Sequence, residues 1–426
     1  MIAALALLLP ILLLAFGQPI FLVFLTAAVV FAFAFLPNIP PEALHTAIFG
    51  SLDNFALLAV PLFIYAGDIM ARGGIAKRII DLIMTIVGRI RGSLAVATIA
   101  SASAFGAMSG SSVACVAAIG KLTLPSLEKA GYGRTFSVSM ITATGVIDAI
   151  IPPSIPMIIY AVTAQQPVNV LFTAGILPGI LVAIALAGYV MMRAHWQVIP
   201  LGEPMKREVV WAALKNSIWA IFAPVVILGG IYGGIFTATE AAGVACLYAI
   251  VVSVFIYREL SWNELWTITL ESSALVGQIM VIVAAAGAYS WLITTSGFPM
   301  KLVAFVDSLG LQPWSLLLVI NIMLLCVGSV LEPPAAILLL TPLLTPIAAK
   351  AGIDPIHFGL IVCVNLAVGM FMPPFGLNLF ASNALFQTPL PALYRGVLPF
   401  LGIYLVLLVL ITYVPALTLI PVKLLH

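Results

Sequence analysis

The fold is decided by a stretch that occurs twice, as GVIDAIIPPS at residues 145–154 and as LAVGMFMPPF at residues 366–375. The second copy lies 221 positions after the first, and the two Pro-Pro pairs coincide at that offset. The same offset aligns further residues outward from this stretch, namely Pro125 with Pro346, KAG at 129–131 with KAG at 350–352, Gln166 with Gln387, Gly175 with Gly396, and Pro178 with Pro399. Internal repeats in a membrane chain are typical of transporters.

The composition indicates that lipid is the solvent of this chain. Of its 426 residues 63% are hydrophobic and 8% are charged, and the mean hydropathy is +1.23. A bilayer core about 30 Å thick requires roughly 20 apolar residues per helix, and such runs recur along the whole length. The strands of a membrane barrel would be short and would alternate polar with apolar residues. We therefore predict an all-α polytopic membrane protein whose first apolar segment, without a basic start or a cleavage site, is retained.

The basic residues predict the orientation. Three of the 17 Lys and Arg residues fall in segments assigned to the outside, and 14 fall in segments assigned to the other side, which should be cytoplasmic. The three are Lys301, Lys350 and Lys423, and the 14 are Arg72, Lys77, Arg78, Arg89, Arg91, Lys121, Lys129, Arg134, Arg193, Lys206, Arg207, Lys215, Arg258 and Arg395.

The first half divides into scaffold helices at 1–91 and a first repeat at 92–192. Residues 2–36 form one bent helix or two short segments, because Gly17-Gln18-Pro19 interrupts them. An outside loop at 37–52, a crossing at 53–71 and an amphipathic interfacial arm at 72–91 follow. The repeat begins with a re-entrant hairpin whose tip lies near Ser109–Ser112, continues with a crossing at 135–165 that is broken at 151–154, and returns at 170–192.

The second half repeats this plan. A polar linker is expected at 193–215, followed by central helices at 217–236 and 238–257. These three segments make up a region at 193–266. A scaffold helix and a second arm are expected next, at 267–312. The second repeat at 313–426 has a hairpin with its tip at Gly328–Pro334, a crossing at 356–386 that is broken at Pro373-Pro374, and a last helix at 397–420. An odd number of crossings between equivalent elements makes the two repeats inverted.

The two hairpin tips and the two breaks should meet. Lipid does not satisfy freed backbone groups, so interrupted helices at membrane depth must face protein or a wet cavity. Half-helices that start near Ser112, Ser154, Pro334 and Phe375 would offer unpaired N–H groups and partial positive charge to an anion. The predicted substrate-binding residues are Ser112, Ser154, Pro334 and Asn378.

Carbonyls freed before each break suit a small hard cation such as Na⁺, with hydroxyls assisting. The predicted ligands of a first cation site are Ser109, Gly110, Ser111, Ser112, Gly145, Val146, Asp148 and Pro152. The predicted ligands of a second site are Gly328, Ser329, Leu331, Glu332, Asn365, Gly369 and Met372. The structural alternative is that Ser and Gly only allow helices to pack closely, and the clustering of these residues at both matched breaks favours the ion site.

Asp148 and Glu332 are ionisable residues inside apolar runs, which marks them as functional residues; the alternative is that each caps a half-helix or pairs with a nearby base. They occupy different registers of the repeat, which argues against an intramembrane aspartyl protease. A passive anion channel is a second alternative.

The sequence contains neither a metal-ligand spacing such as HExxH nor a Gly-rich phosphate loop, so we expect no metal centre and no use of ATP. We also expect no nucleic-acid partner. The four cysteines lie in apolar runs and are expected to be small buried side chains.

Three segments together resemble the large membrane subunit, of the DctM type, of TRAP transporters: AFGAMSGSS at 104–112, GVIDAIIPPSIP at 145–156 and GMFMPPFGLN at 369–378. The resemblance covers essentially the whole chain. It implies a Na⁺-coupled elevator of the ion transporter superfamily, in the bacterial inner membrane, coupled to two or more Na⁺. It also implies a small four-helix membrane subunit, a periplasmic substrate-binding protein and an organic acid substrate such as a C4-dicarboxylate or sialic acid.

One feature departs from related single-component carboxylate transporters, which carry Ser-Asn-Thr at both hairpin tips. This chain has Ser-Gly-Ser-Ser at residues 109–112 and Ser-Val-Leu-Glu-Pro-Pro at residues 329–334. The departure favours the tripartite branch of the superfamily. It also leaves open which side chains serve as ligands at the second cation site.

Overall fold

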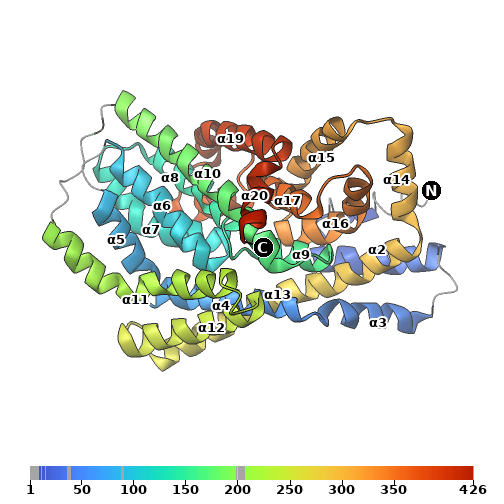
Figure 1. Ribbon diagram of the computed structural model, residues 1–426, viewed down its shortest axis with the longest axis horizontal. Helices are drawn as coiled ribbons and strands as arrows, with labels where there is room; N and C mark the ends of the chain where they lie inside the picture. Colours follow the sequence, from blue (N-terminus) through green and yellow to red (C-terminus); the bar gives the residue numbers. More distant parts are fainter. Residues whose placement is uncertain are drawn as a thin grey trace.

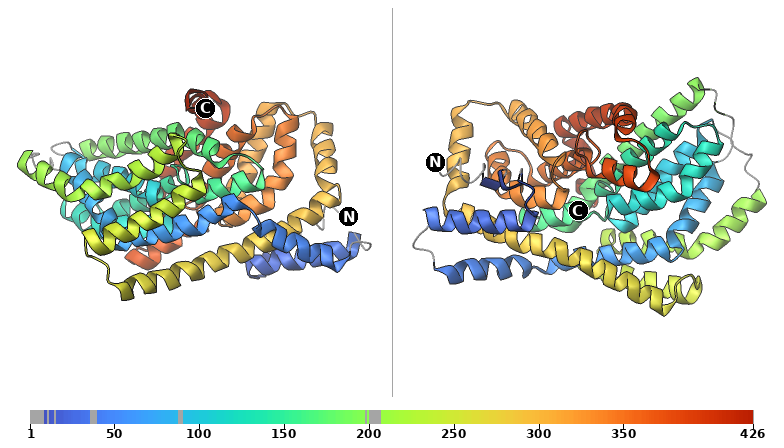
Figure 2. Two further views of the ribbon diagram at one scale, coloured as in Figure 1. Left: turned by 60° about the horizontal axis from the view of Figure 1, so that its bottom comes forward. Right: turned by 180° about the vertical axis from the view of Figure 1, so that it is seen from behind.

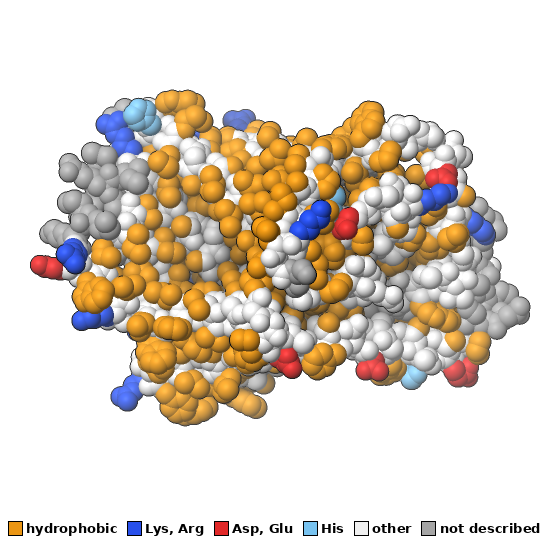
Figure 3. Space-filling model, viewed as in Figure 1, with side chains coloured by type: hydrophobic (Ala, Val, Ile, Leu, Met, Phe, Trp, Pro, Cys, Tyr) orange, Lys and Arg blue, Asp and Glu red, His pale blue; other side chains and the backbone are white. Residues whose placement is uncertain are grey.

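The computed structural model describes residues 9–10, 12–14, 16–35, 40–87, 91–197, 199 and 207–425. Seven of the described helices are long and apolar enough to cross a membrane, and six shorter apolar helices accompany them. The seven are Phe55–Arg72, Val168–Trp196, Arg207–Tyr232, Ala238–Ile256, Trp262–Thr295, Pro333–Lys350 and Leu390–Tyr413. The chain is therefore a multi-pass membrane protein with helical architecture. In Figure 3 hydrophobic side chains cover much of the visible face, and charged side chains lie mostly near its margins.

The helices of the first half are α2 (Ile20–Phe35), α3 (Pro41–Leu52), α4 (Ala59–Arg72), α5 (Ile75–Val87), α6 (Ser93–Ser109), α7 (Ser112–Lys129), α8 (Arg134–Thr144), α9 (Ile155–Thr163) and α10 (Val168–Trp196). Two 3₁₀ turns precede α4 and follow α8, namely η1 (Phe55–Leu58) and η2 (Gly145–Ala149).

The helices of the second half are α11 (Arg207–Tyr232), α12 (Ala238–Ile250), α13 (Trp262–Thr295), α14 (Phe298–Ser308), α15 (Pro313–Gly328), α16 (Pro333–Lys350), α17 (Pro355–Gly369), α18 (Leu377–Phe386), α19 (Leu390–Tyr413) and α20 (Ala416–Leu425). A π-helical turn, η3 (Val251–Ile256), extends α12.

The structure carries the sequence repeat element by element. When 221 is added to the residue numbers of α6 to α10, these helices coincide with α15 to α19. The shifted bounds of α7 are identical to those of α16. The two repeats exchange partners: α7 packs on α18 while α16 packs on α9, and α8 packs on α19 while α17 packs on α10. Equivalent helices α10 and α19 run antiparallel where they meet. Tyr189 of α10 contacts Phe400 of α19, with ring centroids 5.2 Å apart, and Arg193, later in α10, lines a cavity with Arg395, earlier in α19. Each half thus completes the core of the other.

The helices outside the two repeats form a layer of their own. In Figures 1 and 2, α2, α3, α4, α11, α12 and α13 lie along one side of the molecule, and α6 to α10 and α15 to α20 lie beside them. Within this layer α13 packs on α2, α3 and α4, and α12 packs on α4. The layer is held by apolar contacts and by polar pairs such as Asp68 with Ser272, whose hydroxyl donates to the carboxylate over 2.6 Å.

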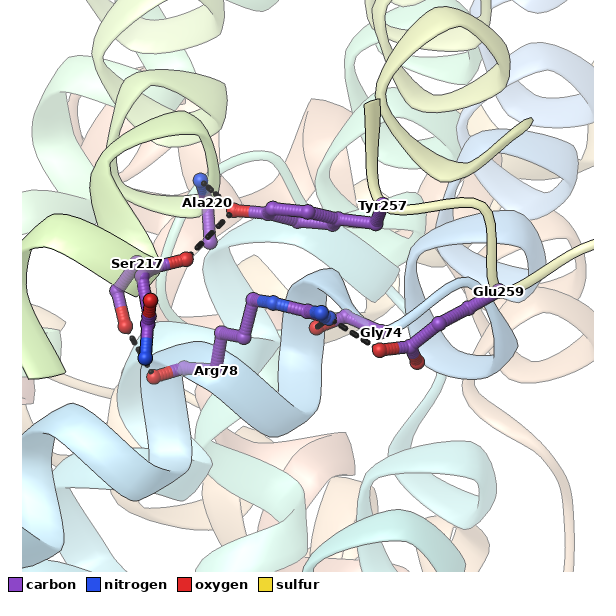
Figure 4. Close-up of polar contacts among 7 residues, drawn as sticks. Gly74, Arg78, Ser217, Ala220, Tyr257 and Glu259 are labelled. Atoms are coloured by element: carbon purple, nitrogen blue, oxygen red, sulfur yellow. Dashed lines mark hydrogen bonds and ion pairs between the residues drawn. The ribbon is translucent and has the colours of Figure 1, made fainter. Parts of the chain in front are cut away.

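A polar cluster fastens α5 to this layer (Figure 4). The guanidinium of Arg78 lies 3.7 Å from the centroid of the Tyr257 ring, and it pairs with Glu259 at 2.6 Å. It also donates to the Gly74 carbonyl at 3.0 Å. The Ser217 hydroxyl of α11 donates to the Arg78 carbonyl at 2.9 Å. The helix that connects α4 to the first repeat is therefore tied to α11 and to the turn between α12 and α13.

Three of the predicted segments are wrong in extent. The expected outside loop at 37–52 is helical from Pro41, because a Pro at the first helical position is compatible with helix geometry. The polar linker expected at 193–215 is shorter, because α10 continues to Trp196 and α11 starts at Arg207 with Glu208 in its first turn. The single last helix at 397–420 is two helices, because Pro415 holds Val414 in an extended conformation between α19 and α20.

Further expectations are settled in part. Helix α2 begins after the Gly17–Pro19 interruption, so this end of the chain bends there, while residues 1–8 lie outside the described part. Arg89, Lys206 and residues 37–39 also lie outside it. Three of the four cysteines are buried as expected, and Cys326 is exposed.

Candidate functional site

The first hairpin tip is a tight turn between α6 and α7. Gly110 adopts a left-handed conformation with φ of 61°, which glycine accepts without the steric cost that other residues have. Ser111 then caps α7, because its hydroxyl accepts a hydrogen bond from the backbone N–H of Ala114 at 3.5 Å. The predicted tip at Ser109–Ser112 is therefore where the structure places it.

The first tip lies against the first break. A methyl group on Gly110 would come within 3.3 Å of the Ile155 side chain, and one on Gly106 would lie 2.7 Å from the Cα of Asp148. Backbones approach this closely only where side chains are absent. Asp148 belongs to the η2 turn and is only 1% exposed. Ser154 follows the break, and its hydroxyl donates to the Ala149 carbonyl at 2.8 Å.

The first tip also contacts the second break, which comes from the other half of the chain. The side-chain amide of Asn378, at the start of α18, donates to the Ser112 hydroxyl at 2.5 Å, and both side chains are buried. A methyl group on Gly145 would lie 3.2 Å from the Ser112 carbonyl oxygen and 3.5 Å from the Asn378 amide nitrogen. Ser112, Gly145 and Asn378 therefore meet although 266 positions separate the first from the last.

The second tip lies against the second break. A methyl group on Gly369 would lie 2.3 Å from the carbonyl carbon of Gly328, so α15 and α17 end in backbone contact. Met372 donates to the Gly369 carbonyl at 3.1 Å, and the Ser329 hydroxyl donates to the Cys326 carbonyl at 2.8 Å. The proline pairs at the two breaks, 152–153 and 373–374, are both cis. The four interruptions thus form one connected region.

Other predicted residues differ in their surroundings. Val146 and Pro152 are buried beside Asp148. Leu331 is buried and Pro334 is partly buried, whereas Glu332 as a whole residue is exposed at the second tip. The structure therefore buries Asp148 in the polar region, whereas Glu332 is an exposed residue of the second tip.

The sequence did not predict the polar pair of Asn321 and Asn365. Asn321 of α15 is buried, and its side-chain oxygen accepts a hydrogen bond from the Asn365 amide at 2.6 Å. The Asn321 amide donates to the Leu317 carbonyl at 2.8 Å and faces the Thr412 hydroxyl at 3.3 Å. The sequence does mark Asn321 as a candidate, since it is the one amide in the otherwise apolar run LLLVINIMLL at 316–325, and polar residues inside such runs are usually functional.

Four buried oxygen atoms of the site have no hydrogen-bond donor among the described residues. They are both carboxylate oxygens of Asp148, the side-chain oxygen of Asn365 and the side-chain oxygen of Asn378. An unpaired buried acceptor costs about 1–3 kcal/mol, and an ionised one costs more. Hard cations bind such oxygens, so the donor set fits Na⁺. In the described part of the chain, groups of three or more His, Cys, Asp or Glu side chains that would hold a transition metal do not occur.

Membrane-spanning helices in two repeats, with interrupted helices that converge on a buried polar region, define a membrane permease. The chain belongs to the DctM family, because the family described as "Tripartite ATP-independent periplasmic transporter, DctM component" matches residues 7–417. This confirms the resemblance found in the sequence, and it excludes the intramembrane protease, since the family consists of transporter permeases. The family is ATP-independent by its description.

Two relatives and one solved structure illustrate the similarity. The C4-dicarboxylate TRAP transporter large permease protein DctM of Pseudomonas aeruginosa is 40% identical over 378 residues, which cover 89% of this chain and 88% of that protein. The isethionate TRAP transporter permease protein DctMQ of Oleidesulfovibrio alaskensis is 38% identical over 384 residues, which cover 89% of this chain and 60% of that protein. The crystal structure of the Alcanivorax borkumensis YdaH transporter aligns with a TM-score of 0.65 at 14% identity, covering 95% of this chain and 97% of that one.

Proposed function

We propose that this chain is the large permease of a tripartite transporter that takes up a small organic acid anion, coupled to two or more Na⁺, across the bacterial inner membrane. The observation that supports it most directly is that buried oxygens lack hydrogen-bond donors on Asp148, in the first proposed cation site, and on Asn365, in the second. In a membrane interior such oxygens are stabilised by a bound cation.

The proposed topology is a pair of inverted repeats with two re-entrant hairpins and two broken helices. The antiparallel course of α10 and α19 and the exchanged pairing of the repeats support the inversion. The turns of two and four residues between α6 and α7 and between α15 and α16 support re-entrance. Freed backbone groups at these points then face protein and a wet pocket instead of lipid.

The proposed coupling sites follow the two halves. The first uses the tip at Ser109–Ser112 with Gly145, Val146, Asp148 and Pro152, and the second uses the tip at Gly328–Glu332 with Asn365, Gly369 and Met372. The anion would lie between them, against the N-termini of α7, α9, α16 and α18, near Ser112, Ser154, Pro334 and Asn378. Each cation increases the affinity for the anion, which is the physical basis of symport.

The proposed movement is that of an elevator. The two repeats, 92–192 and 313–426, would form the transport domain, and the remaining helices would form the scaffold. A cavity of about 720 Å³ lies between α3 and α13 on the scaffold side and α9 and α16 on the transport side. An open cavity separates the two domains here in place of a continuous packed core, which supports relative sliding of the two domains.

The proposed partners are a small four-helix membrane subunit and a periplasmic substrate-binding protein, which supply the other two components of the tripartite system. The substrate is proposed to be a small organic anion because the two relatives above are named for C4-dicarboxylates and for isethionate, both of which are anions.

Uptake into liposomes tests the proposal. The large permease with its small subunit is reconstituted, the binding protein is added outside with labelled C4-dicarboxylate, isethionate and sialic acid in parallel, and an inward Na⁺ gradient is imposed. We expect accumulation of one of these anions above its outside concentration, which a passive channel does not produce. Accumulation that is the same with choline in place of Na⁺ contradicts the coupling.

Two substitutions locate the first coupling site. We expect Asp148→Asn or Ser111→Ala to raise the Na⁺ concentration needed for half-maximal uptake about tenfold, since one ligand is worth on the order of 1.4 kcal/mol. Ser103→Ala is a matched control, because that hydroxyl donates only to the Ile99 carbonyl of its own helix. Unchanged Na⁺ activation in assembled Asp148→Asn protein removes this residue from the site.

A further inference from the structure

A second cavity, of about 370 Å³, lies where the start of α8, the end of α10 and the first turns of α19 meet. Two arginines line it, Arg193 from α10 and Arg395 from α19, and its other lining residues are Thr135, Phe136, Ala392, Gly396 and Pro399. None of these described lining residues has a carboxylate, and none of them belongs to the candidate transport site. The cavity is therefore a separate and strongly basic place in the fold.

Arg193 is held in a fixed orientation. Its guanidinium lies 4.4 Å from the centroid of the Phe136 ring, and one terminal nitrogen donates to the Tyr189 hydroxyl at 3.3 Å. Its Nε atom is buried and has no hydrogen-bond partner in the described part of the chain. The terminal nitrogens of a guanidinium stacked in this way can bind an oxyanion with little loss of side-chain entropy.

Neither arginine of this cavity is neutralised by the protein described. Arg72, Arg78 and Arg134 pair with Glu271, Glu259 and Glu128. Arg193 and Arg395, by contrast, form no ion pair with any described Asp or Glu side chain. Two uncompensated positive charges in one cavity predict an anionic ligand with several acceptor oxygens, such as a phosphate group.

The surroundings of the cavity distinguish a lipid phosphate from a free one. Large apolar side chains are exposed on the same helix ends: Met192 and Trp196 on α10, and Leu398 on α19. A free phosphate requires no apolar surface, whereas a phospholipid places acyl chains beside its headgroup. An anionic headgroup beside basic residues at a helix end, with Trp at the interface, is the usual arrangement at the cytoplasmic membrane surface.

We propose that this cavity binds the headgroup phosphate of an anionic phospholipid, whose acyl chains lie along α10 and α19. Because these are the equivalent last long helices of the two repeats, the bound lipid joins one repeat to the other. The inference does not depend on Na⁺ coupling or on the identity of the transported anion.

Native mass spectrometry of the purified permease, titrated with dioleoylphosphatidylglycerol, tests the proposal. The variant is Arg193→Gln/Arg395→Gln, and the matched control is Arg207→Gln/Arg258→Gln, which removes the same charge from two exposed arginines outside the cavity. We expect the double variant to weaken lipid binding about 30-fold, which corresponds to two bases at about 1 kcal/mol each. The control is expected to bind within about threefold of the parent protein, because surface charges act weakly.

Two further arms settle the source of the phosphate. Dioleoylphosphatidylcholine has a phosphate but no net charge, and it is expected to bind at least about tenfold more weakly than the anionic lipid. Inorganic phosphate at about 10 mM is expected not to displace the anionic lipid. Equal loss of binding in the variant and the control overturns the proposal, and so does displacement by inorganic phosphate. Thermal unfolding of both variants in detergent confirms that a loss of binding is not a loss of folding.

Discussion

The hydrogen bond between Ser112 and Asn378 is the direct link between the first hairpin and the second break, and its removal tests the assembled site. Asn378 is fully buried and Ser112 is 6% exposed, so neither group gains water when its partner is lost. Ser112→Ala leaves the Asn378 amide unpaired, which costs about 1–3 kcal/mol. Asn378→Ala leaves the Ser112 hydroxyl oxygen without this donor. The O–H of that serine can still donate elsewhere, so we expect a smaller cost for that group, about 1 kcal/mol.

A double-mutant cycle isolates this interaction from the loss of packing. Hydrogen bonds between membrane helices couple by about 0.6 kcal/mol on average and by at most about 1.7 kcal/mol. The 2.5 Å distance and the burial of both groups place this pair in the upper part of that range. We therefore expect Ser112→Ala/Asn378→Ala to be about 1 kcal/mol less destabilised than the sum of the single variants.

The assay is equilibrium unfolding in mixed micelles of increasing dodecyl sulfate content, followed by tryptophan fluorescence. Ser112→Ala combined with Asn383→Ala is the matched control cycle, since Asn383 of α18 donates to the carbonyl of Thr388 in the loop that follows this helix. That control should be additive within about 0.5 kcal/mol. A coupling energy for Ser112 and Asn378 below the same limit shows that the two halves do not meet here, and it refutes the description of the site.

Two other contacts give predictions of defined size. Gly369→Ala should destabilise by about 1–3 kcal/mol and abolish uptake, because its methyl group meets the backbone of Gly328 at 2.3 Å; full activity in the same liposome assay contradicts this close contact. Arg78→Gln should destabilise by about 1–2 kcal/mol, because it loses a partly buried tyrosine-ring contact and the pair with Glu259. Arg72→Gln, whose pair is half exposed, should lose under about 1 kcal/mol in the same unfolding experiment, and equal losses would show that the ring contact contributes nothing.

The interruptions of the helices were predictable from the sequence because their causes are local. Pro152-Pro153 and Pro373-Pro374 remove backbone donors and clash with the preceding turn, and Gly110 permits the left-handed turn of the first tip. The repeat fixed the equivalent elements, and apolar length fixed the crossings. The ends of segments were less predictable. Helix α3 and the start of α11 contain polar and charged residues, so the length of an apolar run does not identify them as helical.

The partners of the polar residues were not predictable in the same way. Asp68 and Arg72 are four positions apart, which predicts an ion pair on one helix face. In the structure Asp68 accepts from Ser272 and Arg72 pairs with Glu271, because α13 packs beside α4 and offers both partners. Asn321 was missed for the same reason, since its role depends on Asn365 of another helix.

The sequence by itself determined the membrane class, the twofold repeat and the four points where helices stop, because apolar length and proline geometry act within a few residues of the chain. Only the tertiary structure decided that Ser112 reaches Asn378, that Asp148 is buried while Glu332 is exposed, and that Arg193 and Arg395 share a cavity. These relations depend on how the two repeats exchange partners. That exchange is set by the packing of side chains more than 150 positions apart, for which one sequence contains no local signal.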